Sequence, residues 1–316
     1  MAIKDKSLFL FEWAVLVYCA FTLVLMAVLG TRLVSPAPML FGRLGAVAMT
    51  IALWRLYCLK PNRWTMVLRV AGQLMLLGWW YPDTYDLNRS FMNLDHLFAQ
   101  CEQSLFGCQP ALLFSQNFSS PLFSELLCLG YFSYYPMIAA VTAYYFFCRY
   151  DRLPYCVFVI LVGFFLFYIV FIFLPVVGPQ FYYQAVGVDQ ISQGIFPNIG
   201  NYFLNHQESL PIPGAEGGLF HSLVQQAHNA GERPTAAFPS SHVGISVLLL
   251  WLVRDTRAWW LFAILLVLSL LMFFATFYIQ AHYAIDAIAG LFVGTAFYFV
   301  SRWLYVRLCK SRQPIA

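Results

Sequence analysis

The stretch Pro239-Ser240-Ser241-His242 opens one apolar segment of the chain, and His282-Tyr283-Ala284-Ile285-Asp286 opens the last one. Each stretch places a histidine at the surface end of a predicted transmembrane helix, and the topology predicted below puts both on the same side of the membrane. Two histidines, one with a carboxylate four residues later, suit nucleophilic attack on phosphorus followed by proton donation to the leaving oxygen.

The composition predicts a membrane protein. The chain has 316 residues, of which 61% are hydrophobic and only 10% are charged, whereas about a quarter of the residues in a soluble domain are charged. The net charge of +4 does not indicate nucleic-acid binding, because the Lys and Arg residues lie between apolar runs rather than in a stripe. The first apolar run is long enough to span and lacks a small-residue cleavage site, so a cleavable signal peptide is not expected.

The apolar runs predict an all-α polytopic membrane protein with about eight transmembrane helices in a single membrane domain, residues 1–316. The runs are Leu8–Leu29, Met39–Leu59, Trp64–Tyr81, Pro121–Phe147, Pro154–Val177, His242–Val253, Ala258–Ile279 and His282–Val306. The sixth is short for a spanning helix. The sequence shows neither an internal repeat nor a low-complexity tract.

Positive charges predict the orientation. With the N-terminus inside, the inner ends and loops hold twelve Lys and Arg residues, and the outer loops hold only Arg32, Arg89 and Arg233. The twelve are Lys4, Lys6, Lys60, Arg63, Arg149, Arg152, Arg254, Arg257, Arg302, Arg307, Lys310 and Arg312. This bias predicts that both termini are cytoplasmic and that both histidines lie at the outer face.

Two long outer segments are predicted, residues 82–120 and 178–239. The first contains an amphipathic stretch around Leu94–Leu105, which is expected to lie on the membrane surface. The second leads into Pro239, and loops of this length are usually functional. A disulfide between Cys101 and Cys108 is possible only if a turn separates them, because seven residues of helix hold the Cα atoms about 10 Å apart.

Proline followed by two serines is typical of a helix start, with Ser240 or Ser241 as the N-cap. The free N–H groups of a first helical turn and the positive end of the helix dipole suit a phosphate, and His242 lies in that turn. The alternative is an ordinary helix cap with an interfacial histidine.

His282 and Asp286 are four residues apart, which on a helix places them on one face, about 6 Å apart along the axis. Asp286 is expected to accept a hydrogen bond from one ring nitrogen of His282, which fixes the tautomer and leaves the other nitrogen free to attack. The alternative is a structural His–Asp pair that ties helices together.

Pro-Ser-x-His followed by His-x-x-x-Asp resembles the type 2 phosphatidic acid phosphatase superfamily over about residues 92–300. The resemblance implies that His282 is the nucleophile, that Asp286 orients it, and that His242 protonates the leaving group. It also implies a core of six helices, so that residues 1–60 are two additional helices and residues 61–310 form the catalytic core.

The motifs depart from the phosphatases. The phosphatases have Ser-Arg seven residues before the second histidine, where this chain has Ala275 and Thr276, and Gln226 stands where they have a Lys seven residues before Arg233-Pro234. The chain is more similar to the inositol phosphorylceramide synthases around Ala237–Gly244 and Ala275–Gly290, and residues 213–219 are similar to their glycine-rich loop. The short termini resemble a bacterial member, which implies the inner membrane with the site at its periplasmic face, or a Golgi lumen-facing site in a eukaryote.

This resemblance implies transfer of a phospho-headgroup, most simply phosphoinositol from a phospholipid, onto a ceramide-type acceptor. Arg233, Ser240, Ser241 and Gln280 are the predicted phosphate contacts; a diester, with one charge, needs fewer cations than a monoester. No cofactor is expected, and His206, His221 and His228 lack the further ligands of a metal site. The alternatives are a lipid phosphate phosphatase and a non-enzymatic lipid-binding or transport protein; the oligomeric state stays open.

Overall fold

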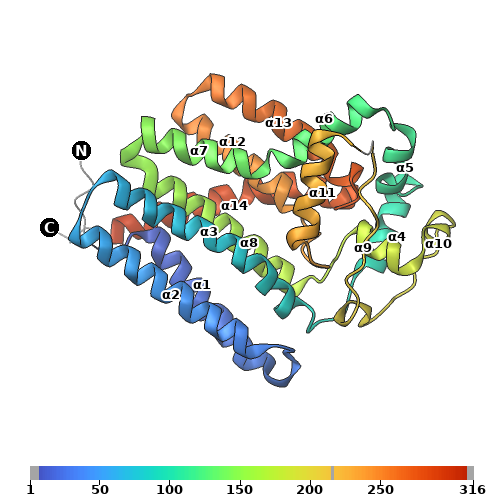
Figure 1. Cartoon of the computed structure of the whole chain (residues 1–316), viewed down its shortest axis with the longest axis horizontal. Helices are drawn as coiled ribbons and strands as arrows, with labels where there is room; N and C mark the ends of the chain where they lie inside the picture. The colour runs from blue at the N-terminus through green and yellow to red at the C-terminus, as the bar shows by residue number, and fades with distance from the viewer. Residues whose placement is uncertain (1–6, 215–216, 312–316) are drawn as a thin grey trace.

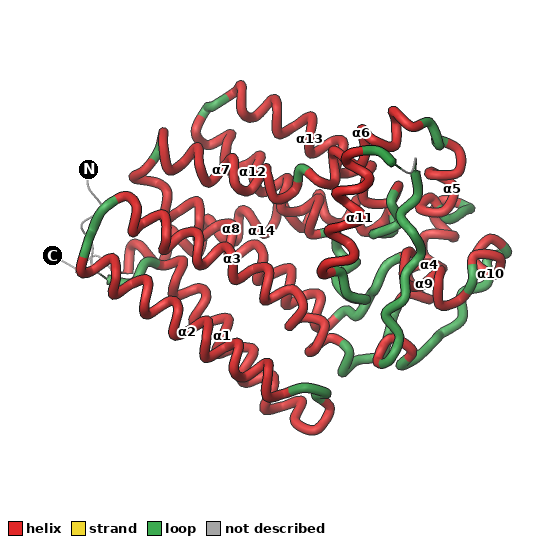
Figure 2. Tube along the Cα trace, in the orientation of Figure 1, coloured by secondary structure: helices red, strands yellow, loops and turns green. Residues whose placement is uncertain are grey.

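The computed structural model describes residues 7–214 and 217–311, and across these residues it contains helices and no strand. The all-α membrane fold is therefore confirmed. Figure 1 shows an elongated bundle of long helices with a cap of short helices at one end, and Figure 2 shows that most of the loop structure gathers at that capped end. Lys4, Lys6, Ala215, Glu216 and Arg312, which enter the sequence predictions, lie outside the described residues.

The elements follow in chain order. The long helices are α1 (Leu10–Leu29), α2 (Pro36–Leu59), α3 (Arg63–Asn88), α6 (Pro121–Phe132), α7 (Tyr134–Cys148), α8 (Leu153–Phe173), α12 (Ser241–Thr256), α13 (Trp259–Tyr278) and α14 (Ala284–Ser311). The capped end contains α4 (Asp95–Phe106), α5 (Pro110–Asn117), α9 (Pro179–Val186), α10 (Val188–Ser192) and α11 (Leu219–Gly231). Short 3-10 turns cover Gly30–Arg32, Tyr150–Arg152 and Tyr202–Leu204.

Among the described residues, five helices are long and apolar enough to cross a membrane: α1, α2, α8, α13 and α14. The predicted run Pro121–Phe147 forms α6 and α7, which are bent by 47° and count as a sixth span if taken together. The two remaining predicted runs fall in α3 and α12, which do not meet the same criteria.

The charged residues of α3 and the short length of α12 explain why these two helices do not meet the criteria. Helix α3 carries Arg69 and Asp83, whose charges are paired with residues of α1 and α2. Helix α12 has 16 residues, about 24 Å of helix against a hydrocarbon core about 30 Å thick. It packs against α7, α8, α13 and α14, so its neighbours separate much of it from lipid.

Two buried ion pairs join the N-terminal helices to the rest of the bundle. Arg43 of α2 donates to both carboxylate oxygens of Asp83 in α3, each at 2.7 Å. Arg69 of α3 donates through Nε to Glu12 of α1 at 2.7 Å and makes a second contact with the same carboxylate through Nη2. All four residues are at most 4% exposed, so each charge is neutralised within the bundle.

Small residues bring α12 and α14 close together. A Cβ added at Gly294 would lie 2.3 Å from the carbonyl oxygen of Gly244, and one at Gly290 would lie 2.6 Å from the carbonyl oxygen of Ser240. Helices that lack side chains at their crossing can approach until their backbones touch. This crossing brings the start of α12 beside the start of α14, and with them the two histidine motifs.

The amphipathic stretch predicted around Leu94–Leu105 is α4. Cys101 lies within this helix, Cys108 lies beyond its end, and both are free thiols in the structure. A left-handed turn at Gly107 ends the helix between them.

Candidate active site

The main chain holds His282 in place. The residue lies in the connection between α13 and α14 and is 3% exposed. Its Nδ1 is 2.7 Å from the carbonyl oxygen of Ala237, and its backbone N–H donates to the carbonyl of Thr276 at 3.1 Å. Because a carbonyl oxygen only accepts, Nδ1 carries the proton and Nε2 presents a lone pair.

The expected hydrogen bond between His282 and Asp286 is not formed. The nearest carboxylate oxygen is 3.8 Å from Nδ1 of His282, and the same oxygen accepts the backbone N–H of Tyr283 at 2.8 Å. The reason is that α14 begins at Ala284, so His282 precedes the helix and the helical i, i+4 geometry does not apply. Asp286 instead accepts a backbone N–H at the start of the helix and keeps its carboxyl group beside the ring.

His242 lies opposite, in the first turn of α12. Its Nδ1 is 3.4 Å from Nε2 of His282. The rings of Tyr131 and Tyr134 lie against it, with centroids 4.5 Å and 4.3 Å from that of the imidazole. The structure therefore brings together the two histidines and Asp286, with the free nitrogen of His282 facing His242.

Ser240 and Gln280 lie beside the histidines but are engaged in holding the backbone. Ser240 is the N-cap of α12: its Oγ accepts the N–H of Val243 at 3.4 Å, and its own N–H donates to the carbonyl of Asp286 at 3.0 Å. The carbonyl of Gln280 accepts the N–H of Gln180 at 2.8 Å. Ser241 is the first residue of α12 and is half-buried.

Arg233 is placed differently from the other predicted phosphate contacts. Its side chain is exposed, and Nη1 donates to Oε1 of Gln207 at 2.8 Å. The guanidinium thus binds within the segment 178–239.

Left-handed backbone flanks the loop residues that hold His282. Ala236 has a φ of 69° and Gln280 has a φ of 65°, a conformation that costs a residue with a Cβ about 1 kcal/mol or more. Ala236 precedes the carbonyl that fixes the His282 tautomer, and Gln280 is two residues before His282. Such strain persists only where the surroundings enforce it, and it is frequent at functional sites.

Glu232 is a site residue that the sequence did not reveal. One carboxylate oxygen accepts from Nδ1 of His228 at 2.5 Å and from Gln180 at 2.8 Å, and the other accepts the hydroxyl of Tyr131 at 3.1 Å. Burial opposes its ionisation, but the hydrogen bond and charge of His228 hold the pKa of Glu232 at about 2. The resulting carboxylate favours positive charge on His242, but burial and the charge of His282 outweigh it and lower the pKa of His242 to about 3. The only signal in the sequence was its position beside Arg233.

Burial also sets the charge of His282. Loss of hydration lowers the pKa of His282 to about 4, against the opposing influence of the Ala237 carbonyl and of Glu232. The ring is therefore neutral at pH 7, which is the form that can attack an electrophile.

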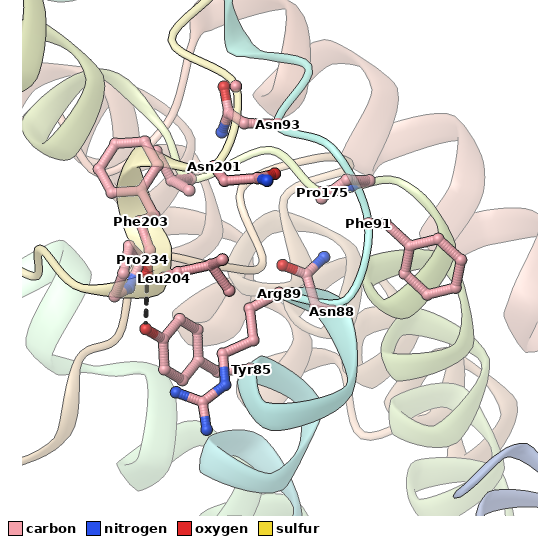
Figure 3. Close-up of a pocket in the computed structure, with 12 residues that line it drawn as sticks. Tyr85, Asn88, Arg89, Phe91, Asn93, Pro175, Asn201, Phe203, Leu204 and Pro234 are labelled. Atoms are coloured by element: carbon pink, nitrogen blue, oxygen red, sulfur yellow. Dashed lines mark hydrogen bonds between the residues drawn. The ribbon is translucent and has the colours of Figure 1, made fainter. Parts of the chain in front are cut away.

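A small cavity lies where the end of α3 meets loops of the capped end (Figure 3). Arg89, Asn88 and Asn93 line it together with Pro234, and the hydroxyl of Tyr85 donates to the carbonyl of Phe203 at 2.8 Å beside it. Arg89 is paired with Asp86 at 2.6 Å. Neither histidine of the candidate site lines this cavity.

The comparisons with known proteins bear on this site as a whole. A family model described as the PAP2 superfamily matches residues 97–300, a range that includes most of α4, both histidine motifs, all of α12 and most of α14. No curated protein and no solved structure matches the chain. Because the model spans more than half of the chain, this protein belongs to the PAP2 superfamily, and phosphatase or phosphotransferase chemistry on a lipid follows from that membership.

Proposed function

We propose that this protein is an integral-membrane phosphotransferase that moves a phospho-headgroup, phosphoinositol from a phospholipid, onto a ceramide-type acceptor through a phosphohistidine at His282. One observation carries the proposal: Nδ1 of His282 is bonded to the Ala237 carbonyl at 2.7 Å, so that the lone pair of Nε2 faces His242 at 3.4 Å. This is the arrangement that a histidine nucleophile and its acid–base partner require.

In the first step, Nε2 of His282 forms a bond to the diester phosphorus, and the bond from phosphorus to the diacylglycerol oxygen breaks. That oxygen takes a proton from His242. Asp286, 3.8 Å from the His282 ring, favours the positive charge that develops on His282, and the ionised Glu232 favours the protonated form of His242 from which the proton comes. In the second step, the primary hydroxyl of the ceramide attacks phosphorus, its proton passes to His242, and the P–N bond to His282 breaks.

Substrate binding must separate the two rings, because 3.4 Å between their nitrogens leaves no room for a phosphoryl group. His282 is fixed by two backbone hydrogen bonds, whereas the contacts of His242 are with aromatic rings. The imidazole of His242 is therefore the ring expected to move. Sliding across the face of Tyr131 would preserve its stacking on that ring.

The charges around the site favour a phosphodiester over a phosphomonoester. Near the histidines the structure places Glu232, Asp286 and the N-terminus of α12, and Arg233 binds Gln207 instead. A monoester carries nearly two negative charges at pH 7 and would need several fixed cations. A diester carries one, which the first-turn N–H groups of α12 can accommodate with Ser241 and with Arg233 if that side chain turns inward.

We also propose how the protein is oriented in the membrane. The α2–α3, α7–α8 and α12–α13 connections, which hold Lys60, Arg149, Arg152 and Arg257, lie on the side of the N and C labels in Figure 1, opposite the capped end. The positive-inside rule then puts these connections in the cytoplasm and the histidines at the outer face. In a bacterium that face is periplasmic, and in a eukaryote it would face the Golgi lumen.

The test is to incubate purified protein in detergent with phosphatidylinositol and ceramide. The proposal expects equal amounts of diacylglycerol and inositol phosphorylceramide, and no product from His282→Ala. His206→Ala is the matched control, since His206 is an exposed loop histidine stacked on Tyr202. Release of inorganic phosphate from phosphatidic acid without a new sphingolipid would identify a lipid phosphatase. Product formation by His282→Ala at the wild-type rate would contradict a catalytic role for this site.

A further inference from the structure

Helix α4 has the polarity of a helix that faces lipid on one side and the protein interior on the other. Asp95 and Glu102, seven residues apart on one helical face, are both 0% exposed, whereas Leu97 is 50% and Leu105 is 66% exposed. In water this arrangement would be unfavourable, but at the membrane it turns the apolar face to lipid and the acids to the protein. The two acidic side chains are therefore placed to hydrogen-bond with the part of the protein that α4 covers.

Asp95 fixes the loops around His282. Its carboxylate accepts the N–H groups of Val177 and Gly178 at 2.7 and 2.9 Å and the hydroxyl of Tyr283 at 3.1 Å. Tyr283 directly follows His282 in the chain. Gly178 packs so closely on this loop that an added Cβ would lie 2.5 Å from the carbonyl oxygen of Ala281.

Glu102 reaches the start of α14. Its Oε1 accepts the N–H of Ala284, the first residue of that helix, at 3.0 Å. Its Oε2 is buried and has no hydrogen-bond partner within the described parts of the chain, and the same holds for Oδ1 of Asp286. Both side chains are fully buried. Two orphaned carboxyl oxygens at one helix start require an explanation, because buried polar atoms are nearly always bonded.

The surroundings of Glu102 decide its protonation. The titratable groups that interact with it are Asp286 at the start of α14, Tyr183 of α9 and Tyr283. None of these is a cation. Burial, together with the negative charge of Asp286, raises the pKa of Glu102 to about 8, against the pull of the Ala284 N–H. Asp286 is buried as well, so the two neighbouring carboxyl groups do not both ionise readily, and the pair holds a proton at neutral pH that Glu102 can donate.

We propose that Glu102 is a positioning residue for the nucleophile: its protonated carboxyl donates a hydrogen bond to the carboxylate of Asp286 while its other oxygen holds the Ala284 N–H. Together with Asp95 it locks the segment 282–286 against α4. Asp286 then stays ionised 3.8 Å from the His282 ring, where its charge stabilises the imidazolium-like transition state. This role rests on the proposed nucleophilic function of His282.

The test compares Glu102→Gln with Glu102→Ala in the headgroup-transfer assay with phosphatidylinositol in detergent. Glutamine keeps a donor for Asp286 and an acceptor for the Ala284 N–H, and alanine keeps neither. A hydrogen bond to a charged group is worth about 1.5–3 kcal/mol, so Glu102→Ala should lower kcat about tenfold or more relative to Glu102→Gln, with KM little changed. Gln100→Ala, on the exposed face of α4, is the matched control for the helix itself.

A pH profile separates proton donation from a merely structural role. As pH rises through about 8, Glu102 ionises, its hydrogen bond to Asp286 is lost, and kcat of the wild type should fall. That alkaline fall should be absent in Glu102→Gln, which cannot ionise.

A second readout does not depend on turnover. Infrared difference spectra of the purified protein should show a protonated carboxyl group that disappears as pH is raised through about 8, and Glu102→Gln should lack it. This signal survives even if the substrate assignment is wrong, so failure of the inference and failure of the proposed function are distinguishable. Equal kcat values for Glu102→Gln and Glu102→Ala, or the absence of the infrared signal at neutral pH, would overturn the proposal.

Discussion

At the scale of single residues, the tautomer of His282 is set by a backbone carbonyl rather than by a carboxylate. In serine proteases an aspartate both orients the catalytic histidine and stabilises its charge, and its replacement by asparagine costs about 10⁴ in kcat because the wrong tautomer forms. Here the Ala237 carbonyl bonds the ring at 2.7 Å, and Asp286, the proposed source of the charge, lies 3.8 Å from it. The two roles lie on different residues.

Asp286→Asn should therefore retain measurable activity. The amide oxygen can still accept the Tyr283 N–H, and Ala237 still fixes the tautomer, so only the charge beside the ring is lost. We expect kcat to fall about 100-fold, which corresponds to about 2.7 kcal/mol, when headgroup transfer is measured at neutral pH. Asp286→Ala, which also removes the acceptor of the Tyr283 N–H, should be worse. A loss of 10⁴ or more for the asparagine variant would mean that Asp286, and not Ala237, fixes the tautomer.

Residue patterns predicted this site in part. The types and spacing of His242, His282 and Asp286 indicated phosphoryl chemistry, because few other functions need two histidines at the surface ends of apolar segments. The partners of those side chains could not be predicted. Ala237 acts through its carbonyl, which every residue has, and Glu232 and Glu102 become site residues only through the packing of α11 and α4.

At the scale of elements, the crossing of α12 and α14 holds the two histidine motifs together. Gly294→Ala places a methyl group 2.3 Å from the backbone of Gly244, so the helices must separate or shift. We expect lower thermal stability in detergent and at least a tenfold loss of transfer activity, since a displacement of about 1 Å at reacting groups can cost 10²-fold.

The matched control for this variant is Gly45→Ala in α2, a helical glycine with nothing within 4 Å of an added Cβ. That change should preserve activity and leave stability equal or higher, by up to about 1 kcal/mol, because alanine favours helix. Equal behaviour of the two variants would show that the crossing is not tightly constrained.

A second prediction at the scale of elements concerns the buried ion pair between Arg69 and Glu12. Arg69→Leu leaves a fully buried carboxylate without its partner and should destabilise the protein by about 3–5 kcal/mol. The double variant with Glu12→Leu should recover most of this loss. Arg55→Leu, at an exposed position of α2, is the control. Thermal unfolding in detergent measures all of them; a double variant no more stable than Arg69→Leu would contradict simple charge pairing.

Apolar runs predicted the number and order of the long elements better than their ends. The run Pro121–Phe147 is interrupted at Ser133 by a bend of 47° between α6 and α7, which hydropathy does not reveal. The sequence predicted α4 as an amphipathic stretch, but it did not show that the face carrying the acidic residues turns toward the protein. A sequence does not show which face of an interfacial helix meets the protein.

At the scale of the whole molecule, the separation of the capped end from the positively charged connections predicts which parts are accessible from each side of the membrane. In a background lacking Cys101 and Cys108, a cysteine at the exposed position Glu208 should react with an impermeant thiol reagent in intact cells. A cysteine at the exposed position Arg254, at the opposite end of the bundle, should react only after permeabilisation. The reverse pattern would place the histidines at the cytoplasmic face.

The central claim is that His282 carries the headgroup between two lipids. Phosphatidylinositol labelled with ³²P should therefore transfer label to the purified protein when the acceptor lipid is absent, and peptide mapping after an alkaline quench should locate the label on His282. Adding ceramide should discharge that label into a lipid product at the rate of turnover, and His282→Ala should acquire none. Turnover without a labelled intermediate, or label on another residue, would contradict the account.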